Sequence, residues 1–364
     1  MQSLSNHLRA LVKSIVTVGL LSAVCFTAAV ATGLAGDTAA HASTQTYSIT
    51  DLGTLGGSST YAYGINGNGQ IVGKSLVKLK KGYAYHAFLY SAGTMTDLGT
   101  LGGDYSEARA INKYGDVAGF SNLCAGCYPD HAFLDHNGHM KDLGSLGGGS
   151  SNAYGINDFA EVVGDSYTAS NQDHAFLYSG GTMTDLGTLG GAPSSANDIN
   201  NSHQVVGSSE TSNTSSSTLH AFLWSNGTMT DLGTLGGSTS IAYAINDVGQ
   251  IVGDASPPTG SVHAFLYSGG KMTDLGSFGD ASEALAITTS GVVVGTAYVV
   301  NRNGTAAWHA FIYTGGTLQD LNTLIPSGSG WLLTEATGIN DTGQIVCNAT
   351  NSSGYTHAFL LNPI

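Results

Sequence analysis

The stretch HAFLYSAGTMTDLGTLGG, from His86 to Gly103, decides the fold, because closely similar stretches return along the rest of the chain. The tripeptide His-Ala-Phe occurs seven times, at His86, His131, His174, His220, His263, His309 and His357. The dipeptide Asp-Leu also occurs seven times, at Asp51, Asp97, Asp142, Asp185, Asp231, Asp274 and Asp320. Successive copies lie 43 to 48 residues apart, and such periods indicate propellers, solenoids or arrays.

Each unit is expected to contain four short strands. In the unit that begins at Asp51, the strands are expected over residues 61–65, 70–75, 86–91 and 94–98. The third and fourth strands are joined by Ala92-Gly93 here and by Asn-Gly or Gly-Gly in later units, as a two-residue type I′ hairpin requires. Four antiparallel strands in about 45 residues make one propeller blade. The sequence therefore predicts an all-β, seven-bladed β-propeller.

The two ends of the chain complement each other. The last unit stops after HAFLLNP, at Pro363, and has no fourth strand. The segment YSITDLG, from Tyr47 to Gly53, matches a fourth strand that no third strand precedes. We expect this N-terminal strand to complete the last blade and close the ring, which removes exposed sheet edges. An open β-solenoid is the alternative, although about 45 residues is long for one coil.

Residues 1–42 read as a signal peptide. Arg9 and Lys13 precede an apolar stretch over residues 15–35, and AHA at residues 40–42 matches the A-x-A cleavage pattern. A membrane anchor is the alternative, but Gly, Thr and Ser interrupt the apolar run. We expect a mature domain of residues 43–364 that is extracellular or periplasmic.

The charge balance excludes some partners. The whole chain carries a formal net charge of −14, and loss of Arg9, Lys13 and Asp37 with the leader makes it −15. Neither nucleic acid nor an anionic membrane surface attracts such a chain. No later stretch is long and apolar enough to span a bilayer. Only 10% of the residues are charged and 52 are glycine, which suits short strands joined by tight turns.

The repeat pattern resembles the bacterial extracellular HAF-repeat family, named for the tripeptide that starts at His86. The resemblance covers residues 51–364, and the chain departs from the pattern at Thr288, at DLNTLIP from Asp320, and at Cys347. It implies a probable extracellular repeat protein. It supplies no activity and no catalytic residues.

Length variation between the units is confined to two connections. Those between the second and third strands, and between the fourth strand and the next first strand, vary in length, whereas the other turns are constant. In a four-stranded meander the two variable connections open on the same face of the disk. A variable loop surface on a rigid scaffold is typical of a binding face, and we expect the opposite face to be inert.

Two positions near the start of the first strand also differ in type between units, with an alanine between them. The outer position holds Tyr61, Glu107, Asn152, Ser195, Ile241, Glu283 and Glu335. The next holds Tyr63, Arg109, Tyr154, Asn197, Tyr243, Leu285 and Thr337. Because the innermost strand borders the channel, we predict ligand contacts from Tyr63, Arg109, Tyr154 and Tyr243, with Glu107, Glu283 and Glu335 as acceptors. Neutral drift in the packing between blades is the alternative.

The seven repeated histidines invite a metal hypothesis, which distance argues against. The third strand lies roughly 10 Å outward from the first, so related histidines are too far apart to share a zinc ion. We place His86 opposite Gly99, which makes Asp97 a diagonal neighbour. A repeated His–Asp contact follows, and we expect no metal and no cofactor. Asn-Asp pairs such as Asn157-Asp158 read as turns, with calcium binding as the alternative.

Cysteines are few. Cys124 and Cys127 are expected to form a local disulfide in an exported protein. A zinc site is the alternative, and it would need Asp130 and His131 as further ligands. Cys347 is expected to be a buried free thiol.

The sequence therefore predicts a monomeric, non-enzymatic protein that binds a polar ligand, a glycan or peptide, or a cell-surface partner. The alternative is a propeller hydrolase or lyase that acts on carbohydrate at the channel mouth. No nucleophile elbow, phosphate loop or isolated carboxylate pair stands out from the repeats.

The leader prediction is tested on the natural protein. Cleavage after Ala42 should leave a chain that starts at Ser43, because signal peptidase cuts after the A-x-A pattern. Mass spectrometry of protein taken from outside the cytoplasm measures the N-terminus, and an intact Met1 would contradict the assignment.

Overall fold

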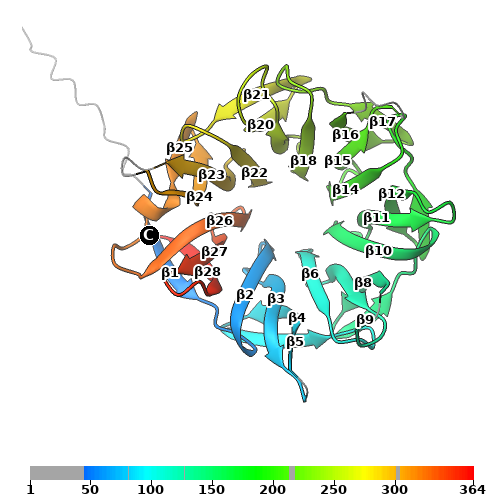
Figure 1. Cartoon of the computed structure of the whole chain (residues 1–364), viewed down its shortest axis with the longest axis horizontal. Helices are drawn as coiled ribbons and strands as arrows, with labels where there is room; N and C mark the ends of the chain where they lie inside the picture. The colour runs from blue at the N-terminus through cyan, green and yellow to red at the C-terminus, as the bar shows by residue number, and fades with distance from the viewer. Residues whose placement is uncertain (1–44, 81, 127, 213–217, 301–303) are drawn as a thin grey trace, which may run out of the picture. The chain divides into compact units, whose positions relative to one another are not determined.

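Twenty-eight strands form seven four-stranded antiparallel sheets in the computed structural model, which describes residues 45–364 except 81, 127, 213–217 and 301–303. The sheets follow one another as blades around a central channel (Figure 1). The predicted seven-bladed β-propeller is confirmed. No helix in the described ranges is long and apolar enough to cross a bilayer.

In each of the first six blades the strands run outward from the channel in chain order. The first blade comprises β2 (Gly56–Ile65), β3 (Ile71–Lys78), β4 (Tyr83–Ser91) and β5 (Thr94–Gly99), and the second β6 (Ser106–Ile111), β7 (Val117–Asn122), β8 (Asp130–His136) and β9 (His139–Asp142). The third comprises β10 (Gly147–Ile156), β11 (Val162–Thr168), β12 (Asp173–Ser179) and β13 (Thr182–Asp185), and the fourth β14 (Ser194–Ile199), β15 (Val205–Glu210), β16 (Leu219–Ser225) and β17 (Thr228–Asp231). The fifth comprises β18 (Ser240–Ile245), β19 (Ile251–Ala255), β20 (His263–Ser268) and β21 (Lys271–Gly276), and the sixth β22 (Ser282–Ile287), β23 (Val293–Val300), β24 (Ala306–Thr314) and β25 (Thr317–Asp320), followed by the 3-10 helix η1 (Leu321–Thr323).

The last blade joins the two ends of the chain. It consists of β26 (Trp331–Ile339), β27 (Ile345–Asn351), β28 (Thr356–Pro363) and, at its outer edge, β1 (Tyr47–Asp51). Strand β1 pairs with β28 from Tyr47 opposite Pro363 to Asp51 opposite Phe359. The His357 Nδ1 atom lies 2.8 Å from the Asp51 carboxylate. The predicted closure by the N-terminal strand is confirmed.

The repeated residues form the joints between blades. Seven apolar clusters lie between neighbouring blades, and each contains the phenylalanine of one HAF tripeptide and an alanine from a third strand. Between the second and third blades, for example, Ala132 and Ala153 pack with Phe176, and all three side chains are fully buried. Burial of such apolar surface is the main driving force for assembly of the ring.

The hairpin between the third and fourth strands has the predicted type I′ geometry, with φ of 49° at Ala92 and 82° at Gly93. The predicted His–Asp contact is also confirmed, since the His86 Nδ1 atom lies 2.9 Å from the Asp97 carboxylate and all seven units repeat it. The predicted register is wrong by one residue. Ala87, not His86, pairs with Gly99, because the fourth strand bulges where Gly99 adopts a φ of 73°.

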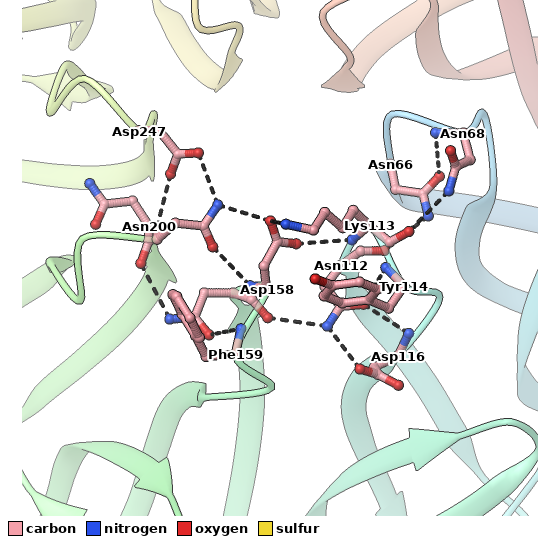
Figure 2. Close-up of polar contacts among 12 residues, drawn as sticks. Asn66, Asn68, Asn112, Lys113, Tyr114, Asp116, Asp158, Phe159, Asn200 and Asp247 are labelled. Atoms are coloured by element: carbon pink, nitrogen blue, oxygen red, sulfur yellow. Dashed lines mark hydrogen bonds and ion pairs between the residues drawn. The ribbon is translucent and has the colours of Figure 1, made fainter.

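A ring of asparagines ties the blades together where each first strand ends. The Asn66 side chain accepts two backbone N–H bonds within its own turn, and its Nδ2 atom donates to the Asn112 carbonyl of the next blade (Figure 2). Equivalent bonds between blades start from Asn112, Asn157, Asn200, Asn246 and Asn340. Thr288 takes the seventh position and has no amide to donate. There the Thr289 N–H and hydroxyl donate to the Asp341 carboxylate, both at 2.9 Å.

Removal of residues 47–53 should open the ring. The deletion exposes the edge of β28 and takes away the buried side chains of Tyr47 and Leu52, which are 2% and 6% exposed. Their burial alone is worth about 3–6 kcal/mol. Chemical denaturation should show a loss of this size in the free energy of unfolding.

A transplant separates loss of the strand from general damage. Residues 48–53 are moved behind Asn362 and joined by two glycines, as Gly180-Gly181 joins the equivalent strands of the third blade. This variant should recover the stability that Leu52 and the strand pairing supply, but not the part that Tyr47 supplies. A deletion that melts like the wild type would contradict the role given to β1.

Candidate binding site

The channel holds a cavity of about 420 Å³, within the usual range for small-molecule sites. It is lined by Tyr63, Arg109, Tyr154, Ser195, Asn197, Tyr243, Leu285, Glu335 and Thr337. Seven of these residues, one from each blade, stand at the same position of the first strand, the position that Tyr63 has in β2. We call it the inner variable position, and the position of Tyr61 the outer variable position. Five of the seven predicted contact residues line the cavity, whereas Glu107 and Glu283 are not part of its wall.

A β-bulge in every first strand places these residues. Ala62 pairs with Gly73 and Gly64 pairs with Val72, so Tyr63 is an extra residue without a partner of its own. The six other first strands bulge at the equivalent residue. Because a bulge re-aims the side chain of its extra residue, the variable residue points differently from a residue in a regular strand. The alternation of residue types along the strand does not predict this bulge.

The repeated glycine of the second strand brings that strand close to the first. A Cβ atom on Gly73 would lie 1.9 Å from the Tyr61 carbonyl oxygen and 2.8 Å from the Phe88 ring. The residue after this glycine lies opposite the outer variable position, as Lys74 lies opposite Tyr61. It too varies between blades, as Lys74, Phe120, Asp165, Ser208, Asp254, Thr296 and Asn348. Sequence reasoning missed this ring, although variation directly after a repeated glycine was a usable signal.

The first two blades hold a buried charged network. The Glu107 side chain is only 2% exposed. Its carboxylate lies 2.6 Å from the Lys74 Nζ atom and 2.6 Å from the Arg109 Nε atom, and it accepts a 2.6 Å bond from the Tyr105 hydroxyl. Glu107, predicted as a ligand acceptor, thus has its oxygens engaged by neighbours and holds two cations in place.

Aromatic rings surround both cations. The Arg109 guanidinium lies 4.4 Å from the centroid of the Tyr63 ring and 5.6 Å from that of Tyr154. The Lys74 Nζ atom lies 5.4 to 5.8 Å from the ring centroids of Tyr61, Tyr63, Tyr85 and Tyr105. A cation over an aromatic face gains about 0.5–2 kcal/mol, more where water is excluded. The tyrosines of this channel therefore form surfaces that hold cations.

The fifth to seventh blades carry carboxylates instead. Asp254 is 6% exposed, and burial raises the pKa of its carboxyl to about 6, while the Tyr243 hydroxyl donates to it. Burial, followed by the charges of Asp254 and Glu335, raises the pKa of Glu283. Glu335 lines the cavity and accepts a 3.2 Å bond from Asn348.

The phenols of the cavity stay neutral. Burial is the main cause that raises the pKa of Tyr63, Tyr154 and Tyr243. At neutral pH each therefore presents a hydroxyl that can donate or accept, and an aromatic face.

The rim beside the variable connections is aromatic. Tyr83, Tyr128 and Tyr167 lie on these connections or the strand ends next to them and are 60%, 92% and 39% exposed. Basic residues are found on the first of these connections, where Lys78 ends β3 and is exposed, whereas Lys81 lies outside the described residues.

The opposite face has its own cavity. It measures about 320 Å³ and is lined by the turns that contain the asparagine ring. Tyr114 and Phe159 are exposed on these turns, at 67% and 63%. The expectation that this face is inert stays a prediction.

The cysteine and metal predictions have mixed outcomes. Cys347 is a buried free thiol, as predicted, and burial raises its pKa. Cys127 lies outside the described residues, so its disulfide with Cys124 stays a prediction. Within the described ranges, no three His, Cys, Asp or Glu side chains are grouped to hold a metal ion.

No protein-family model and no curated protein matches this sequence. Solved structures do match. The β-propeller domain of the Trilobed protease from Pyrococcus furiosus, described as having an open velcro topology, aligns with a TM-score of 0.55 and 11% identity over 85% of this chain and 94% of its own. The acylaminoacyl peptidase of Pyrococcus horikoshii aligns with a TM-score of 0.51 and 11% identity over 83% of this chain and 52% of its own. This chain therefore spans about half of that peptidase. At such identities the likeness shows the fold alone.

Replacement of Asp254 by asparagine should stabilise the protein at neutral pH. The folded-state pKa of about 6 lies above the ordinary value of about 3.9, so the stability that Asp254 contributes when protonated is lost as pH rises through 6. The amide that replaces the carboxyl is neutral at every pH, so Asp254→Asn should raise Tm at pH 7.5 and have little effect at pH 4. Thermal denaturation at both pH values measures this.

Asp274→Asn is the matched control, because Asp274 is 42% exposed and paired with His263. It should not raise Tm at pH 7.5. A lower Tm for Asp254→Asn at pH 7.5 than for the wild type would show that burial of the Asp254 charge is not costly.

Proposed function

We propose that this protein is an exported, non-enzymatic β-propeller that binds a polar ligand in the 420 Å³ cavity. One observation carries the proposal: a variable position of the repeat, the inner one of the first strand, supplies a wall residue from every blade. The residues that pack between neighbouring blades are alike around the ring, whereas the residues that line the cavity differ from blade to blade. A scaffold that selects a ligand needs this division of roles.

The chemistry of the wall supports a polar ligand. Tyr63, Tyr154 and Tyr243 each offer a flat apolar ring and a neutral hydroxyl, and tyrosine gives a large contact area at low cost in side-chain entropy. Asn197 and Thr337 add further hydrogen-bonding groups. Exposed tyrosines at the rim would extend the contact along a larger glycan or peptide.

Export is part of the proposal. The leader over residues 1–42 and the resemblance to the extracellular HAF-repeat family support a location outside the cytoplasm. The net charge of −14 supports a partner other than nucleic acid.

A carbohydrate hydrolase is the second candidate, and one pair of carboxylates favours it. Asp165 and Asp173 lie on neighbouring strands of the third blade. Burial raises the pKa of both, to about 6 for Asp173. The Asp173 Oδ1 atom is buried without a hydrogen-bond partner among the described residues. A carboxyl that is protonated near neutral pH can act as a general acid, so release of reducing sugar that Asp173→Asn abolishes would favour this candidate.

Loss of the cavity tyrosines should abolish binding. A glycan and peptide array probed with residues 43–364 identifies the ligand. The triple variant Tyr63→Ala, Tyr154→Ala, Tyr243→Ala should then lose binding, since truncation of a buried tyrosine contact costs about 2 kcal/mol or more at each hot spot. Circular dichroism shows whether the variant is folded.

The matched control removes aromatic rings from the opposite face. The double variant Tyr114→Ala, Phe159→Ala should bind as the wild type does. If the triple variant binds normally and the control loses binding, the ligand occupies the face of the asparagine ring and the proposal is wrong.

A further inference from the structure

The repeats place the same pair of residues at two points along the ring of first strands that borders the channel. Tyr63 and Tyr243 occupy the same inner position of β2 and β18. Glu107 and Glu283 occupy the same outer position of the blade that follows each tyrosine. A tyrosine and a glutamate from adjacent blades therefore recur in the first two blades and in the fifth and sixth.

Two cations complete the first of these sites. Lys74 and Arg109 both contact the Glu107 carboxylate at 2.6 Å, and both lie over the Tyr63 ring, at 5.8 and 4.4 Å from its centroid. The tyrosine and glutamate thus form a site that the chain's own positive charges occupy.

The second site has the same walls without the cations. Asp254 stands where the first site has Lys74, and Leu285 stands where it has Arg109. Within the described ranges, no lysine or arginine forms an ion pair with Asp254, Glu283 or Glu335.

The carboxylates of the second site act on one another. The negative charges of Asp254 and Glu335 both disfavour ionisation of Glu283, after burial itself. Buried charges of one sign are costly unless an opposite charge accompanies them. A cation in the cavity beside Tyr243 would supply what Lys74 and Arg109 supply in the first site.

From this internal comparison, and resting on the proposed function, we propose that the ligand carries an organic ammonium group that binds in the cavity against the Tyr243 ring and Glu335, where Asp254 and Glu283, which are not part of the cavity wall, add negative charge. The ring face and the carboxylates attract the charge. Leu285 lines the same cavity and would contact the carbon skeleton of the ligand. An amino sugar or the side chain of a lysine carries such a group.

Calorimetric titration with three probes tests the ammonium and its source. Glucosamine trimer and N-acetylglucosamine trimer share a sugar backbone, but only the first has free amines, which are partly protonated at pH 7.5. Trilysine offers the ammonium on a peptide. At pH 7.5 at least one ammonium probe should bind 10-fold or more tightly than the acetylated trimer, and the tighter of the two identifies the source.

Two single variants locate the site. Asp254→Asn and Glu283→Gln should each remove the preference for the ammonium probe and leave the fold intact. Asp274→Asn, at the outer edge of the fifth blade, should keep it. Arg302 lies outside the described residues, and the inference requires that it does not neutralise this site, so Arg302→Ala should bind as the wild type does. A 10-fold gain in Arg302→Ala would overturn the inference.

The pH dependence gives an independent readout. The Tyr243 hydroxyl donates to Asp254, and Glu283 interacts with the charges of both Asp254 and Glu335. Trilysine is the probe for this test, because its side-chain ammonium groups stay charged throughout the range. Since Asp254 protonates near pH 6, affinity for trilysine should fall severalfold or more between pH 7.5 and pH 5. Affinity that is unchanged over this range would count against the carboxylates as ligands.

The outcomes separate the two proposals. Binding of the acetylated trimer as tightly as the ammonium probes, or no binding by any of the three, overturns the ammonium inference. The proposed function still stands if an array ligand binds and the tyrosine triple variant abolishes that binding. The proposed function is wrong only if the tyrosine triple variant binds the array ligand as the wild type does.

Discussion

Closure of the ring is the constraint on which everything else depends. Each blade is a small sheet whose faces are covered only by its neighbours, and the last blade is incomplete until β1 pairs with β28. The cavity exists only in the closed state, because its wall takes one residue from each of the seven blades. The pairing of β1 with β28, which joins the two ends of the chain, is thus as important to the cavity as any residue that lines it.

The wall of the channel shows two ways to manage buried charge. Around Glu107 the chain neutralises its own carboxylate with Lys74 and Arg109, and the tyrosine rings take up the remaining faces of the cations. Around Asp254 it leaves carboxylates together without a described cation, at a cost in stability that increases as they ionise. A loss of stability that is confined to one place in an otherwise uniform fold is typical of functional sites.

Much of this could be predicted from the sequence, and the reason is repetition. Strand number, type I′ hairpins, closure and the His86–Asp97 contact depend on local patterns or on comparison of one unit with another. The bulge at Tyr63 and the approach of β3 to β2 depend on how one backbone passes another, which no pattern of residue types reports directly. For the same reason Glu107 could be assigned to the first strand of its blade, but neither its exclusion from the cavity wall nor its engagement by Lys74 and Arg109 could be foreseen.

The uniform joints make the blades interchangeable. Neighbouring blades meet through the same alanines, phenylalanines and asparagine amides almost everywhere around the ring, so a blade does not need a particular neighbour. Recombination between the gene segments that encode these similar repeats could exchange a whole blade and preserve its packing. Each exchange would bring a new inner-strand residue to the channel. A gene built in this way can change the binding specificity of its protein by exchange of whole blades, without a new fold at each step.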